Sequence, residues 1–186
     1  QSVILKKQAA ENKQLLLADA HFRLETKYGQ VVKSDVVTDA SGQLKVIGLP
    51  VGQYQFVEIK APAGYQLDPT PVSFEIIANQ SSAVTVIKTD QAILGSVTLT
   101  KKDSQDSLAL KGAIFELQDS QGNQLQSNLI TDDNGQLTVN SLTLGNYQLV
   151  ETQAPVGYQL DKTPVKFTIS QNQTKVNVVM TNKLIP

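Results

Sequence analysis

The chain of 186 residues contains no cysteine and no tryptophan, and it has a single histidine. The absence of cysteine excludes disulfide bonds, thiolate metal sites and cysteine nucleophiles. Any covalent cross-link must therefore use other side chains. No apolar run is long enough to span a bilayer, and the first residues lack the apolar core of a signal peptide. We expect an excerpt of a mature protein, with no membrane insertion in this segment.

Charge of one sign is also lacking, because 16 basic residues face 17 acidic ones and the net charge is -1. Without a basic stripe, the sequence predicts no nucleic-acid partner. His21 lies on the polar face of its predicted strand, where we expect it to point to solvent. The Asp-rich turn at 131–135 lacks the regular acidic spacing of a calcium loop. We therefore predict no metal site and no cofactor.

The sequence contains an internal repeat. Residues 52–76 align with 145–169, and 17 of these 25 positions are identical. Two shorter stretches match as well, SVILKK with SVTLTK and AVTVIKTD with KVNVVMTN, at 2–7 with 96–101 and at 83–90 with 175–182. The sequence therefore predicts two copies of one domain, at 1–91 and 95–186.

Within each copy, apolar and polar residues alternate over short segments that are rich in β-branched and aromatic residues, which is typical of strands. Turn signals such as TDDNG and APVGY separate these segments. In the second copy they predict seven strands, at 96–101, 113–118, 123–131, 136–139, 146–153, 165–170 and 175–182. We therefore predict an all-β fold of two tandem Ig-like antiparallel β-sandwiches.

The inward-facing rows of three predicted strands end in polar side chains. In the second copy, Lys101 ends the row of the first strand, Glu151 that of a middle strand and Asn182 that of the last strand. The same alternation in the first copy gives Lys7, Glu58 and Asp90. The period-two pattern leaves two interpretations open. The groups either form an ordinary salt bridge at a wet sheet edge or make a buried reactive site.

Burial would change the chemistry of these groups. It favours a neutral amine and a protonated carboxyl, and a neutral amine is a nucleophile. The carboxyl of Glu151 could then polarise the amide of Asn182 and carry protons, while proximity raises the rate. The product would be an amide bond between Lys101 and Asn182, with ammonia leaving.

The stretches that carry these residues resemble a known family. SVTLTKKD, LKGAIFEL, TDDNGQLTVNSLTLGNYQLVETQAPVGY and VVMTN are similar to collagen-adhesin B-type (Cna B-type) domains, found in pilins and stalks of Gram-positive surface proteins. YQLVETQAPVGY resembles the pilin E-box. The resemblance implies a prealbumin-like sandwich with an isopeptide bond between the first-strand lysine and the last-strand Asn or Asp. It assigns the cross-links Lys101 to Asn182 and Lys7 to Asp90, with Glu151 and Glu58 as the catalytic residues.

The first copy departs from the pattern of the family. Ala9 and Asp19 stand where the second copy has Asp103 and Gly112. Lys6 stands beside the expected nucleophile. Asp90 replaces the asparagine, so its bond would release water, and its carboxyl must be neutralised because an ionised carboxylate is a poor electrophile.

The resemblance implies a structural stalk module, outside the cell, on the cell wall or in a pilus. Its partners would be other pilin subunits or the cell wall through sortase, and host surface proteins are a further option. A YPKN-like lysine motif is lacking, which favours a basal or tip pilin or an adhesin stalk over a backbone subunit. After the final TNKLIP we expect a sorting signal.

We expect no enzyme activity beyond a single autocatalytic turnover. Two alternatives remain open on the sequence: an adhesive domain that binds a host matrix protein, and an accessory spacer domain of a secreted enzyme.

Overall fold

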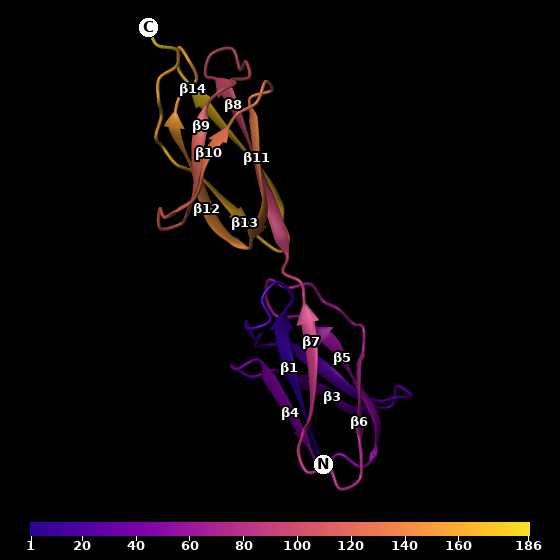
Figure 1. Ribbon diagram of the computed structural model, residues 1–186. Helices are drawn as coiled ribbons and strands as arrows, with labels where there is room; N and C mark the ends of the chain where they lie inside the picture. The colour runs from indigo at the N-terminus through magenta and orange to yellow at the C-terminus, as the bar shows by residue number, and fades with distance from the viewer. The chain divides into compact units, whose positions relative to one another are not determined.

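The computed structural model describes residues 1–186 and is built from strands alone. The chain divides into two compact units, Gln1–Ala92 and Ile93–Pro186. Each unit contains seven strands and its own hydrophobic core (Figure 1). The predicted fold of two tandem prealbumin-like β-sandwiches is confirmed. No helix in the structure could cross a membrane.

The first domain consists of two sheets that face each other across the core. The three-stranded sheet has the order β4-β1-β7 and the four-stranded sheet the order β3-β2-β5-β6. The strands are β1 (Ser2–Ala9), β2 (His21–Thr26), β3 (Val31–Val37), β4 (Gln43–Ile47), β5 (Gly52–Lys60), β6 (Val72–Ile76) and β7 (Val84–Asp90).

The second domain repeats this arrangement. Its sheets have the orders β11-β8-β14 and β10-β9-β12-β13. The strands are β8 (Leu94–Asp103), β9 (Ile114–Asp119), β10 (Gln124–Ile130), β11 (Gln136–Thr143), β12 (Gly145–Gln153), β13 (Val165–Ile169) and β14 (Lys175–Asn182).

One strand pair in each domain is parallel, which the prediction of antiparallel sheets did not include. The first and last strands of each domain run side by side in the same direction, β1 with β7 and β8 with β14. All other pairs are antiparallel. Because both strands of the parallel pair end at the same edge of the sheet, the polar side chains at their C-terminal ends meet there.

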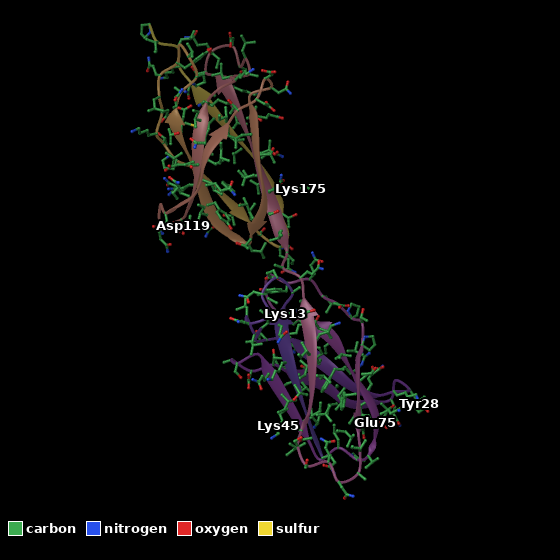
Figure 2. All side chains as sticks on the ribbon, viewed as in Figure 1. Lys13, Tyr28, Lys45, Glu75, Asp119 and Lys175 are labelled. Atoms are coloured by element: carbon green, nitrogen blue, oxygen red, sulfur yellow. The ribbon has the colours of Figure 1, made fainter.

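Alternation along the strands separates the core from the surface. In the first domain Phe56 packs edge-on against Phe22 and stacks on Phe74, with ring centroids 6.1 and 5.2 Å apart. Residues that alternate with inward ones point outward, as Figure 2 shows for the exposed side chains of Lys45 on β4, Glu75 on β6 and Lys175 on β14. The two cores are therefore apolar except at the sheet edge where the parallel strands end.

Strand β8 continues to Asp103, two residues past the predicted end, and β11 continues to Thr143 instead of Val139. A β-bulge between Val139 and Leu142, with Ser141 at a φ of 58°, allows the longer pairing of β11 with β8. A bulge adds a residue without changing the apolar pattern on either side, so alternation alone ends the strand too early. The longer strand β8 includes Asp103, whose side chain is buried.

The turn before β11 closes directly against the backbone of the first strand. Gly135 has a φ of +71°, and its carbonyl accepts a hydrogen bond of 2.6 Å from the Lys101 N–H. A Cβ added at this glycine would lie 2.5 Å from the Lys101 carbonyl oxygen. Gly42 makes the same contact with the Lys7 N–H in the first domain, at 2.9 Å. These glycines of the TDASG and TDDNG turns therefore fix the backbone that carries each inward lysine.

Replacing Gly135 by alanine should destabilise the second domain by about 3 kcal/mol, from left-handed backbone strain plus the clash with the Lys101 backbone. Gly157→Ala is the matched control, because Gly157 has a φ of +88° and no atom within 4 Å of the added Cβ. This control should cost only about 1 kcal/mol. Chemical denaturation of the two variants measures the difference, and equal losses would show that the close approach is not the constraint.

Candidate functional site

The polar ends of three inward rows meet in the core of the second domain. The Nζ of Lys101, from β8, is in direct contact with Oδ1 of Asn182, from β14, and lies 3.4 Å from Oε1 of Glu151, from β12. The Nδ2 of Asn182 donates to both carboxylate oxygens of Glu151 at 3.0 Å. The amine therefore contacts the amide oxygen, while the carboxyl holds the amide nitrogen.

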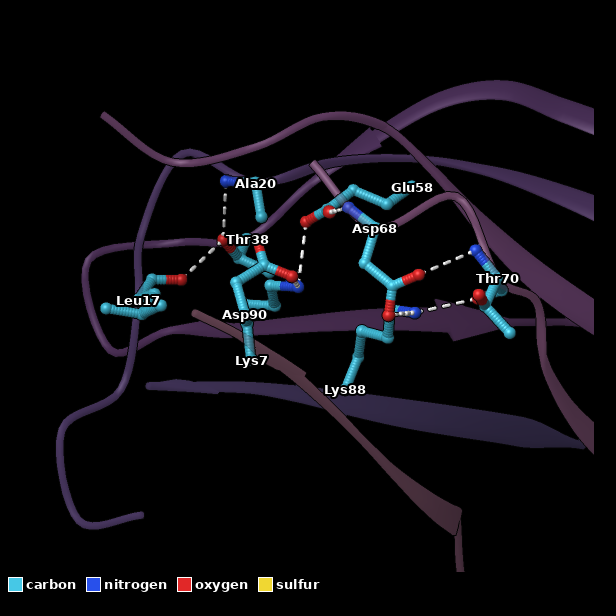
Figure 3. Close-up of polar contacts among 9 residues, drawn as sticks. All are labelled: Lys7, Leu17, Ala20, Thr38, Glu58, Asp68, Thr70, Lys88 and Asp90. Atoms are coloured by element: carbon cyan, nitrogen blue, oxygen red, sulfur yellow. Dashed lines mark hydrogen bonds and ion pairs between the residues drawn. The ribbon is translucent and has the colours of Figure 1, made fainter. Parts of the chain in front are cut away.

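The first domain brings together the equivalent three residues (Figure 3). The Nζ of Lys7 lies 2.8 Å from Oε1 of Glu58 and in direct contact with Oδ1 of Asp90. The other oxygen of Asp90, Oδ2, is buried and has no hydrogen-bond donor. All six candidate residues from the sequence are thus placed as two triads, one in each domain.

Both triads are shielded from solvent, which excludes one of the two interpretations of the sequence pattern, the wet salt bridge. The side chains of Lys7, Glu58, Lys101 and Glu151 are 0% exposed in their ion pairs, so neither site is a wet salt bridge at a sheet edge. A phenylalanine ring lies beneath each amine, Phe22 at 5.5 Å and Phe115 at 5.8 Å from Nζ to the centroid. 

Burial shifts the protonation of these groups toward their neutral forms. It raises the pKa of the Glu58 carboxyl, although hydrogen bonds from Lys7 and from the Asp68 N–H oppose the rise. It lowers the pKa of the Lys101 ammonium, and the neighbouring Glu151 carboxylate opposes this. The environment therefore favours the protonated carboxyl of Glu58 in the first domain and the neutral amine of Lys101 in the second.

A backbone donor orients each glutamate, and alternation along the strands did not reveal it. The N–H of Asp68 donates to Oε2 of Glu58 at 3.1 Å, and the N–H of Asp161 donates to Oε2 of Glu151 at 3.0 Å. Both donors lie in the loop after the E-box strand, inside the repeated YQLD segment. The signal in the sequence is this repeat itself, since a loop of identical sequence can place the same backbone group at both sites.

A second buried lysine stands next to the triad of the first domain. The Nζ of Lys88 donates to Oδ2 of Asp68 and to the carbonyl oxygen of Thr70, both at 2.7 Å. Hydrogen bonds from Lys88 and Thr70 hold the pKa of the Asp68 carboxyl well below its usual range. This Lys–Asp pair is therefore a salt bridge, because the carboxylate is ionised and its side chain is half exposed.

The loop that covers the second triad is fastened by a buried carboxylate. Tyr158, from the E-box segment, donates its hydroxyl to Oδ2 of Asp103 at 2.8 Å. The equivalent Tyr65 in the first domain instead donates to Glu11 at 3.1 Å, on the surface.

The expected solvent position of His21 is only partly correct, since its ring lies 3.0 Å from Asp35 with 23% of the side chain exposed.

The chemistry available to each triad is amide formation inside the core. A lysine nitrogen contacts the electrophilic group of the last strand, and a carboxyl within hydrogen-bonding distance can move protons between them. No group of three or more His, Cys, Asp or Glu side chains could hold a metal ion.

Comparison with solved structures finds the same fold in other bacterial proteins. The Bacillus anthracis TIE protein is 27% identical with a TM-score of 0.87, and the match covers 99% of this chain and 34% of that one. The chain thus spans about a third of the TIE protein. The C-terminal fragment of the pilus adhesin SpaC from Lactobacillus rhamnosus GG is 20% identical with a TM-score of 0.61, covering 100% and 98% of the two chains.

The major pilin subunit BcpA of Bacillus cereus is 19% identical with a TM-score of 0.48, over 99% of both chains. No protein of curated function matches the sequence significantly. The profile of the SpaA prealbumin-like fold domain matches twice, at residues 1–91 and 95–184. These two matches cover nearly the whole chain, which therefore belongs to the SpaA family of prealbumin-like fold domains as a tandem pair.

Proposed function

We propose that the chain is a stalk module of a Gram-positive cell-surface protein, in which each domain closes one intramolecular isopeptide bond. The observation that carries the proposal is the contact, in both cores, between a buried lysine amine and the side-chain carbonyl group of the last strand, with a buried glutamate beside it. Two independent copies of the same arrangement are difficult to account for as structural salt bridges, because burying an ion pair gives little or no net stability.

In the second domain, the neutral amine of Lys101 attacks Cγ of Asn182. Glu151, hydrogen-bonded to the amide nitrogen, transfers a proton to that nitrogen so that it leaves as ammonia. The lysine nitrogen keeps one hydrogen and gives one proton to Glu151, which restores the carboxyl. The C–N bond of the amide breaks and a new C–N bond to Nζ forms, so the atoms balance without any co-reactant.

In the first domain, Lys7 attacks Cγ of Asp90 and one carboxyl oxygen leaves as water. The reactive form arises when the Lys7 ammonium passes a proton to the Asp90 carboxylate, which gives a neutral amine and a neutral acid without changing the total number of protons. The buried Oδ2 of Asp90 has no donor, and an ionised oxygen there would carry the full desolvation cost.

The bonds would join the first and last strands of each domain. They span 81 residues in the second domain and 83 in the first, and closing loops of this size corresponds to about 4 to 5 kcal/mol in the chain-entropy model. Tension that enters at the start of β8 and leaves at the end of β14 would pass through the bond. The intervening residues would then carry no tension, which suits a stalk outside the cell, on the wall or in a pilus, with pilin subunits or the wall as its sortase-linked partners.

The mass of the unfolded full chain tests the proposal. We expect a deficit of one ammonia plus one water relative to the sequence, because each bond expels one of these molecules. Fragment spectra should place the bonds at Lys101–Asn182 and Lys7–Asp90, and not at Lys88–Asp68. An unshifted mass would overturn the proposal, and loss of ammonia alone would restrict it to the second domain.

The matched control for the catalytic carboxyl is Glu116→Ala, which removes a carboxylate from the outward face of β9. This variant should keep the mass deficit of the parent chain. Glu151→Ala should restore the ammonia to the mass, since no group then carries protons to the leaving nitrogen. A Glu151→Ala chain that still cross-links would refute the role assigned to this carboxyl.

Single-molecule stretching measures the mechanical role separately. The parent second domain should show no unfolding extension, whereas Asn182→Ala should lengthen by roughly 28 nm, the contour of the 81 residues that the bond otherwise bypasses. Equal extension of parent and variant would show that tension does not pass through a bond between β8 and β14.

A further inference from the structure

The two triads differ in the residues that lie opposite them in the parallel strand pair. Lys7 is the register partner of Lys88, whereas Lys101 is the partner of Met180. Two residues further along both strands, Ala9 is the partner of Asp90. At the equivalent place in the second domain, Asp103 is the partner of Asn182. The first domain, whose last strand carries an aspartate instead of an asparagine, thus has the additional cation Lys88. It lacks an acid at the position of Ala9, where the second domain has Asp103.

The Lys88 side chain is buried and held by two hydrogen bonds. Its side chain is 9% exposed, and its ammonium is held by Asp68 and by the Thr70 carbonyl. The backbone N–H of the same Asp68 donates to Glu58. Figure 3 shows Lys88 and Asp68 beside the triad, joined to it through this donor. Lys88 therefore both adds charge near the site and fixes the loop that orients the catalytic glutamate.

The charges that face the Lys7 amine come from three elements. Glu58 lies on β5, Asp90 and Lys88 on β7, and Asp68 in the loop after β5. In the second domain, Asn182 is neutral, and the position of Lys88 is occupied by the buried, uncharged Met180. Among the buried side chains, Asp90 adds one negative charge and Lys88 one positive charge to the first site, whereas the second site has the buried Asp103 in place of Ala9.

We infer that Lys88 is a charge-balancing and positioning residue that adapts the first domain to an aspartate electrophile. The inference rests on the proposed cross-link. An unbalanced second carboxylate would draw an additional proton into the site and keep Lys7 as an ammonium ion, which cannot attack. With Lys88 present, the single proton of Lys7 can pass to Asp90, and the amine and the acid become neutral together.

The pH dependence of bond formation distinguishes this role from simple packing. Removing a nearby cation raises the pKa of every neighbouring group, so more alkaline buffer is then needed to free the Lys7 amine. For Lys88→Met we expect the rising limb of the rate profile of the first domain to move up by roughly one pH unit. Lys88→Arg keeps the charge and should leave the profile in place.

The experiment uses cell-free synthesis of the full chain in buffers from mildly acidic to mildly alkaline. Samples are quenched in acidic denaturant and followed by the loss of water from the first domain and of ammonia from the second. The second domain is the internal control, and its profile should be identical in every Lys88 variant. The triple variant Ala9→Asp, Lys88→Met and Asp90→Asn copies the second domain at all three differing positions, and its first domain should then follow the profile of the second.

The reverse transplant keeps the test decisive if Lys88→Met impairs folding. Asn182→Asp alone should lose water from the second domain only in alkaline buffer, and adding Met180→Lys should move that profile down by roughly one pH unit. Unchanged profiles in a folded Lys88→Met chain, or no shift on adding Met180→Lys, would overturn the role of Lys88. Absence of bonds from both domains of the parent chain would instead overturn the proposed function.

Discussion

The contact between a lysine amine and the last strand, in a core closed to solvent, is the constraint on which the rest of each domain depends. It requires that the first and last strands lie side by side and end at the same edge, which the parallel pairs β1–β7 and β8–β14 provide. It also requires that no water reach the amine. The phenylalanine ring beneath each Nζ and the E-box loop beyond it meet that requirement.

Comparison of the two domains shows which parts of the site are fixed and which vary. The lysine, the glutamate, the loop N–H and the turn glycine are the same in both copies. The last-strand residue differs, and so do Lys88, the register partner of Lys7, and Ala9, the register partner of Asp90. The acid in place of the amide therefore occurs together with different neighbouring side chains, while the strand order and pairing are the same in both domains.

Much of this arrangement could be predicted from the sequence. A period of two assigns each side chain to one face, and the repeat allows the assignment in one domain to be compared with that in the other. Lys101, Glu151 and Asn182 follow from that periodicity. The parallel pairing of β8 with β14 does not, since alternation carries no information on strand direction. Nor does the bulge at Ser141, which depends on local backbone conformation. The role of Asp68 was missed for a similar reason, because its contribution comes from a backbone N–H that any residue possesses.

The parallel pairing of the first and last strands has a consequence for the order in which the protein is made. During synthesis Lys7 leaves the ribosome early, and Asp90 follows only when the rest of the domain is already outside. The two groups can meet only if β7 has inserted beside β1 in the correct register. A cross-link formed there would report a domain that is complete and correctly threaded, and a truncated chain would remain open to proteases.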